Sequence, residues 1–69
     1  MEYRLVVAEK ERPHKALILA HSADADALTN FAKAAGHKYF NAMVIDESDE
    51  PVWSLYGVFR YLHARDISS

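Results

Sequence analysis

The sequence predicts a small α+β domain that begins with a β-hairpin, whose second strand also begins a strand–helix–strand unit. Three observations predict it: two short apolar runs without helical spacing near the N-terminus, one amphipathic segment with good helix ends, and a further apolar run after it. The chain has 69 residues, enough for one hydrophobic core, so residues 1–69 are expected to form a single compact domain. We expect about three to four strands with one or two helices.

The first two strands are expected at residues 2–8 and 16–20. Residues 2–8 (EYRLVVA) combine an aromatic residue with leucine and two valines, which favours an extended chain. Residues 16–20 (ALILA) form a continuous apolar run typical of a buried strand. The polar segment 9–14 between them contains Pro13 and predicts the hairpin connection.

The helix is expected over residues 23–35. Its apolar residues recur at helical spacing and form one stripe: Ala25, Leu28, Ala32 and Ala35, with Phe31 at the edge. Ser22 is the expected N-cap, acidic residues occupy the first turn, and Gly36 suits the position after the last turn. His21 and His37 lie at opposite ends of a helix about 20 Å long, so they cannot share a metal ion.

The C-terminal third is less uniform. Residues 38–46 predict a strand and residues 47–51 a loop. For residues 52–65 a helix is favoured, capped by Asp49 and placing Trp53 and Tyr61 off its apolar face, which gives the order β-β-α-β-α. The alternative is an extended tail, β-β-α-β-β, which the aromatic and β-branched content fits.

Composition limits the function classes. The chain has no cysteine, which excludes disulfides and thiolate metal sites, and its longest apolar run is far shorter than the roughly 20 residues of a membrane span. With two glycines there is no phosphate-binding loop, and no serine has an obvious His–Asp pair. We therefore expect a soluble, cytoplasmic, non-enzymatic protein without a cofactor.

Self-association is also expected. Apolar residues make up 51% of the chain, and both faces of the first strand are apolar, since Leu5 and Val7 alternate with Val6 and Ala8. One helix cannot cover both faces of a sheet. Either the tail or a second copy of the chain then covers the other face, and we expect a homodimer.

Chain direction predicts two oppositely charged ends, because successive elements run in alternating directions. The basic end has a net charge of +4 from these residues: Lys10, Arg12, Lys15, Lys33, Lys38, Arg60 and Arg65, with Glu9, Glu11 and Asp66. The acidic end has a net charge of −6 from these residues: Glu2, Asp24, Asp26, Asp46, Glu47, Asp49 and Glu50, with Arg4.

The basic end is the predicted binding surface, together with aromatic residues of the tail. The candidate partner-binding residues are Lys10, Arg12, His14, Lys15, His37, Lys38, Trp53, Arg60, Tyr61, His63 and Arg65. The carboxylates of the loop form a candidate docking patch for a basic partner: Asp46, Glu47, Asp49 and Glu50. The competing interpretation is that these charges only follow helix-dipole preference and loop solvation.

The function expected from these features is binding and modulation, or inhibition, of a macromolecular protein partner with an anionic surface. Short chains without cysteine are often regulators, including those carried by phages or mobile elements, an association with size alone. The alternative is a nucleic-acid-binding module that uses the basic end. The least favoured classes are an enzymatic domain and a metal site. A metal site would use His14, His37 and His63, which are also predicted at the basic end, but the surrounding lysines and arginines oppose a cation.

Overall fold

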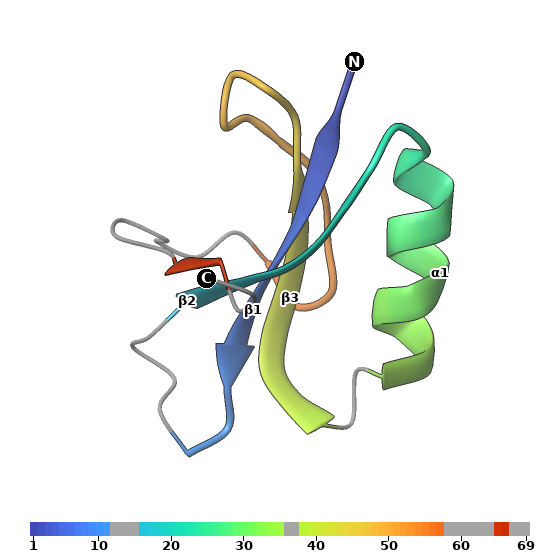
Figure 1. Cartoon of the computed structure of the whole chain (residues 1–69). Helices are drawn as coiled ribbons and strands as arrows, with labels where there is room; N and C mark the ends of the chain where they lie inside the picture. The colour runs from blue at the N-terminus through green and yellow to red at the C-terminus, as the bar shows by residue number, and fades with distance from the viewer. Residues whose placement is uncertain (12–15, 36–37, 58–64, 67–69) are drawn as a thin grey trace.

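The computed structural model describes residues 1–11, 16–35, 38–57 and 65–66, which form one β-sheet with a helix against one face (Figure 1). The elements in chain order are β1 (Tyr3–Glu9), β2 (Ala16–Ser22), α1 (Ala25–Ala35), β3 (Tyr39–Ile45), β4 (Pro51–Ser54) and β5 (Arg65–Asp66). The predicted α+β class is confirmed, and β1, β2, α1 and β3 lie within two residues of their predicted bounds.

The strand order of the sheet is β4-β3-β1-β2-β5. β1 is antiparallel to both β2 and β3, so these two run parallel to each other on either side of it. The strand–helix–strand unit predicted from the sequence is therefore present, but its strands are separated by β1 and α1 connects them across it. β4 pairs antiparallel with β3, and the two residues of β5 pair parallel with β2.

α1 begins at Ala25, two residues later than predicted, because Asp24 caps it in place of Ser22. The Asp24 Oδ1 accepts hydrogen bonds from the backbone N–H groups of Asp26 (3.0 Å) and Ala27 (3.3 Å). The Ser22 hydroxyl oxygen accepts one from the Asp24 N–H at 2.9 Å, in the turn before the helix. In the described part of the chain, no helix has the length and apolar character needed to cross a bilayer.

The helix predicted over residues 52–65 is wrong for residues 52–57, which the structure describes. Pro51–Ser54 form β4, and Val44 pairs with Trp53 across the β3–β4 ladder. Pro51 lacks an N–H donor and so suits the start of an edge strand, and the φ of +116 at Gly57 lies far from helical values. Asp49 is no helix cap but has φ 62 in the loop before β4. Residues 58–64 lie outside the described residues.

Both faces of the sheet carry a buried cluster. The helix-side cluster consists of Leu5, Val7, Leu28, Ala32, Ala42 and Val44. On the opposite face Val6 and Met43 are 0% exposed and Ile45 is 1% exposed. These three side chains are removed from water within a single copy of the chain, so a second copy is not needed to bury them.

Irregular pairing at three places decides where several side chains point. Ala8 pairs with Asn41 but Glu9 pairs with Tyr39, so Phe40 is an extra residue, and it is 58% exposed. In the same way Ile45 pairs with Pro51 and Val44 with Trp53, which leaves Val52 extra and 50% exposed. Between Leu5 and Val6 of β1, the extra residue is Leu19 of β2. The bulges therefore account for the exposure of Phe40 and Val52, and no binding partner is needed to explain it.

A buried amide holds the chain after β4 against the beginning of β3. Asn41 is 6% exposed. Its Nδ2 donates to the Gly57 carbonyl oxygen at 2.8 Å. Its Oδ1 accepts from the N–H groups of Ala42 (2.8 Å) and Tyr56 (3.1 Å). One side chain thus satisfies three backbone groups where regular strand pairing ends.

Candidate functional site

The described residues of the two predicted ends lie at opposite ends of the sheet; Arg12, Lys15 and Arg60 of the basic end lie outside the described residues. Strand pairing places Glu9 opposite Tyr39 at one end of the sheet, and Arg4 opposite Ile45 and Tyr3 opposite Ser22 near the other. The loop after β3 and the turn before α1 therefore lie at the same end of the sheet, away from the C-terminal end of β1 (Figure 1). We keep the names basic end and acidic end for these regions.

Charged side chains at the acidic end contact one another. Arg4 Nη2 forms an ion pair with Asp49 Oδ1, which fastens β1 to the loop after β3. His21 Nδ1 lies 3.3 Å from Glu2 Oε1, and the Glu2 N–H donates to Glu47 Oε1 at 2.7 Å. Together Glu2, Arg4, His21 and Glu47 line a hollow of ≈ 350 Å³. His21 is therefore paired with Glu2, a contact that the sequence does not predict.

The predicted acidic docking patch is largely used within the loop itself. Asp46 Oδ1 accepts hydrogen bonds from the N–H groups of Ser48 (2.8 Å) and Glu50 (3.0 Å), and this side chain shapes the turn. Asp49 and Glu47 make the contacts with Arg4 and Glu2 described above. Three of the four carboxylates thus have structural roles.

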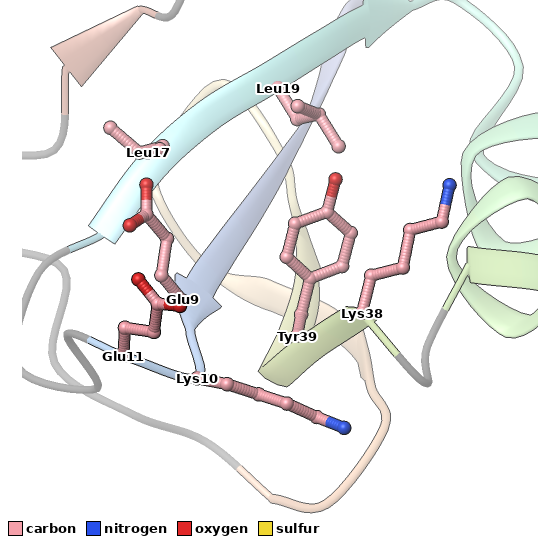
Figure 2. A pocket seen from close by; sticks show the side chains of 7 residues that line it. All are labelled: Glu9, Lys10, Glu11, Leu17, Leu19, Lys38 and Tyr39. Carbon is pink, nitrogen blue, oxygen red and sulfur yellow. The ribbon is translucent and has the colours of Figure 1, made fainter.

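The basic end contains a second hollow, of ≈ 450 Å³ (Figure 2). Its floor is formed by Leu17 and Leu19 of β2 and Tyr39 of β3, which are half-buried and pack against the helix-side cluster. Charged residues form its rim: Glu9, Lys10, Glu11 and Lys38. The hollow thus combines an apolar floor with charges of both signs.

Figure 2 shows how the rim is arranged. The carboxylates of Glu9 and Glu11 lie on the Leu17 side, whereas Lys10 extends to the other side of the chain. Lys38 and Tyr39 rise side by side from the beginning of β3, with the hydroxyl of Tyr39 directed toward Leu19. The hollow therefore has an acidic wall and a basic wall.

These rim charges make no contacts of the kind seen at the acidic end. Within the described ranges, Glu9, Lys10, Glu11 and Lys38 form no ion pair or side-chain hydrogen bond, although both signs are present. Lys38, Lys10 and Glu11 are exposed and Glu9 is half-buried. Their charges remain available to a bound molecule.

The structure brings two of the predicted partner-binding residues together, Lys10 and Lys38, at this hollow. Trp53 is elsewhere: it is half-buried and packs against the helix-side cluster, so it does not have the exposed position that a helical tail would give it. Arg65 lies in β5, next to β2, and only its backbone is described. The remaining candidates lie outside the described residues: Arg12, His14, Lys15, His37, Arg60, Tyr61 and His63. In the ranges that are described, no three His, Asp or Glu side chains are placed to hold a metal ion.

The sequence predicts Leu17, Leu19 and Tyr39 as strand residues, but it does not predict that they form the floor of a hollow. The sequence does indicate that some apolar strand residues, such as Leu17 and Leu19, remain partly exposed. α1 has one apolar stripe and is too narrow to cover a whole sheet face. No comparable signal existed for Tyr39. Strict alternation from Asn41 and Met43 would direct Tyr39 to the opposite face, and the bulge at Phe40 reverses it.

Comparison of the chain with protein-family models gave no match. Comparisons with curated proteins and with solved structures gave no match either.

Proposed function

We propose that this chain is a small non-enzymatic interaction module that binds a macromolecular protein partner through the hollow at the basic end and modulates that partner. The observation that carries the proposal is the rim of the hollow, where the four charged side chains form no ion pair or side-chain hydrogen bond within the described residues. They surround a half-buried apolar floor. Such a surface resembles one side of a protein interface, in which an apolar centre gives affinity and charges at the rim give orientation.

A protein partner fits this surface better than nucleic acid does. Glu9 and Glu11 line the same hollow as Lys10 and Lys38, so a phosphate backbone laid across it would meet two carboxylates. A protein segment can present both signs of charge and an apolar side chain together. The nucleic-acid alternative becomes an outcome of the test below.

A binding role also fits better than catalysis. An enzyme site keeps water away from its reacting groups, which strengthens electrostatic interactions there. Lys10, Glu11 and Lys38 are instead exposed to solvent. We place no substrate or cofactor in the hollow.

The proposal includes a regulatory or inhibitory role in the cytoplasm, with the chain acting as a homodimer. The homodimer rests on the high apolar content of the chain, 51% in a sequence of 69 residues. Light scattering during gel filtration, over a range of protein concentrations, measures the mass in solution. A constant monomer mass would remove the homodimer from the proposal and leave the hollow unaffected.

Affinity capture from lysate of the source cells, with and without nuclease, tests the proposed function. The tag belongs at the N-terminus, where Met1 is 76% exposed. We expect Lys38→Glu to lower capture of the partner about tenfold, which corresponds to about 1.4 kcal/mol. Lys33→Glu is the matched control, because it makes the same charge change on an exposed residue of α1 that does not line the hollow.

Quantitative mass spectrometry compares the captured proteins between the two variants, and thermal unfolding verifies that both are folded. A partner lost with Lys38→Glu, retained with Lys33→Glu and insensitive to nuclease supports the proposal. Equal loss in both variants indicates a general charge effect and contradicts it. Loss upon nuclease treatment would favour the nucleic-acid alternative.

A further inference from the structure

We infer that the hollow binds a short extended segment of the partner in which one apolar side chain lies between a basic and an acidic side chain. The inference rests on the proposed function and specifies the chemistry of the bound segment. The two walls of the hollow differ in charge and its floor is apolar, so the segment that complements it has three parts in a fixed order.

The acidic wall is formed by Glu9, the last residue of β1, and Glu11, which follows the strand. Both carboxylates lie on the Leu17 side of the hollow, whereas Lys10 between them extends to the other side (Figure 2). A lysine or arginine of the partner placed there would face two acceptors.

The basic wall lies on the β3 side. Lys38 immediately precedes β3 and extends beside the ring of Tyr39, whose hydroxyl is directed across the floor (Figure 2). A carboxylate of the partner placed there would meet the Lys38 ammonium group. Charge-assisted bonds of this kind are stronger than neutral hydrogen bonds.

The apolar floor lies between these walls and sets the length of the segment. β2 and β3 are the two neighbours of β1, so the hollow spans two strand spacings, about 10 Å. In an extended peptide alternate side chains share one side and lie about 6.6 Å apart, so the first and fifth are about 13 Å apart. Five residues therefore suffice to bring three alternate side chains to the acidic wall, the floor and the basic wall.

A segment of one charge would fit less well. An acidic segment would place a carboxylate against Glu9 and Glu11, and a basic segment would place an ammonium group against Lys38. Like charges brought together at an interface are a common means of rejecting wrong partners. The hollow thus discriminates by the order of charges rather than by net charge.

Titration of the ¹⁵N-labelled full chain with blocked pentapeptides tests the inference. The probes are acetyl-KALAE-amide and acetyl-EALAK-amide, which cover both chain directions, with KALAK, EALAE and KASAE as controls in the same blocked form. Of the two mixed-charge peptides, KALAE and EALAK, we expect the one with the higher affinity to bind at least about fivefold more tightly than each control, a difference of about 1 kcal/mol. The amide signals of Leu17, Leu19 and Tyr39 should move most.

Charge reversal in the chain sharpens the test. The double variant Glu9→Lys with Glu11→Lys makes both walls basic. It should therefore bind EALAE at least about fivefold more tightly than either mixed-charge peptide. The control double variant Glu47→Lys with Glu50→Lys makes the same charge change at the acidic end and should keep the preference for the mixed peptide.

Equal affinity for all five peptides, shifts centred outside the hollow, or no saturable binding by any peptide would overturn the inference. The capture experiment separates this failure from failure of the proposed function. If Lys38→Glu abolishes capture while the peptides show no preference, the proposed function holds and the bound segment has other chemistry. If capture is independent of Lys38, the proposed function itself is wrong.

Discussion

The two ends of the molecule contain many charged residues but use them differently. At the acidic end, Arg4 pairs with Asp49 and His21 with Glu2, and the carboxylate of Asp46 shapes its own loop. At the basic end, the charges around the hollow form no ion pair or side-chain hydrogen bond among the residues that the structure describes. Charge at the acidic end thus belongs to the fold, whereas the charges around the hollow have no such structural role within the described residues.

A charge count alone does not show which charged side chains already have protein partners. The acidic end has the larger net charge by sequence, yet most of its carboxylates already have protein partners. At the basic end, the charged side chains around the hollow lie beside an apolar floor and form no ion pair within the described residues. Stability measurements can separate the two kinds of charge.

The largest effect is expected at a neutral side chain near the basic end. Asn41→Ala should lower the free energy of unfolding by about 1–3 kcal/mol, because it leaves three backbone groups without their partner. Urea unfolding followed by circular dichroism measures the change. Asn30→Ala is the control, since Asn30 is exposed on α1 and should lose nothing. Equal unfolding midpoints for the two variants would show that Asn41 does not hold this end.

Removal of the helix cap at the acidic end should have the next largest effect. Asp24→Ala should cost about 1 kcal/mol of unfolding free energy, since the Asp26 and Ala27 N–H groups lose their acceptor. Ser22→Ala should cost less, because that hydroxyl bonds a turn before the helix. A larger loss with Ser22→Ala would return the cap to the position predicted from the sequence.

The ion pair between Arg4 and Asp49 should contribute a smaller amount. A double-mutant cycle with Arg4→Gln and Asp49→Asn should give a coupling of about 0.2–1 kcal/mol, because the Asp49 side chain is 60% exposed. The coupling should shrink at 1 M salt, where the screening length is about 3 Å. A coupling of zero at low salt would mean that the acidic end does not gain stability from this pair.

The smallest effect is expected for the charges of the hollow. Glu9→Gln, Glu11→Gln and Lys38→Gln should each change the free energy of unfolding by less than about 0.5 kcal/mol, because their charges contact no described side chain. The same variants should alter peptide binding. A loss of more than about 1 kcal/mol in any of them would assign that charge to the fold and would remove the contrast between the two ends.

Much of the fold was predictable because its signals are local. The amphipathic stripe of residues 25–35 and the apolar runs on either side specify α1, β1, β2 and β3. The alternation of chain direction then gave the two ends. The cap was misplaced because Ser22 and Asp24 are both good N-caps, and the choice depends on where the chain turns.

The tail and the site depended on information that is not local. Residues 52–57 have a mixed pattern, and pairing with β3 decides in favour of a strand. Tyr39 reaches the hollow only because one residue is inserted in the β1–β3 ladder. Alternation of residue types cannot reveal such an insertion, since it depends on the partner strand.

The central position of β1 has a consequence for the order of folding. β1 and β2 are near in sequence, so their hairpin can form before the strands further along the chain are in place. The other side of β1 waits for β3, since Arg4 pairs with Ile45. A chain in which only the hairpin has formed therefore carries a two-stranded ribbon with an open edge, a species that is exposed to aggregation.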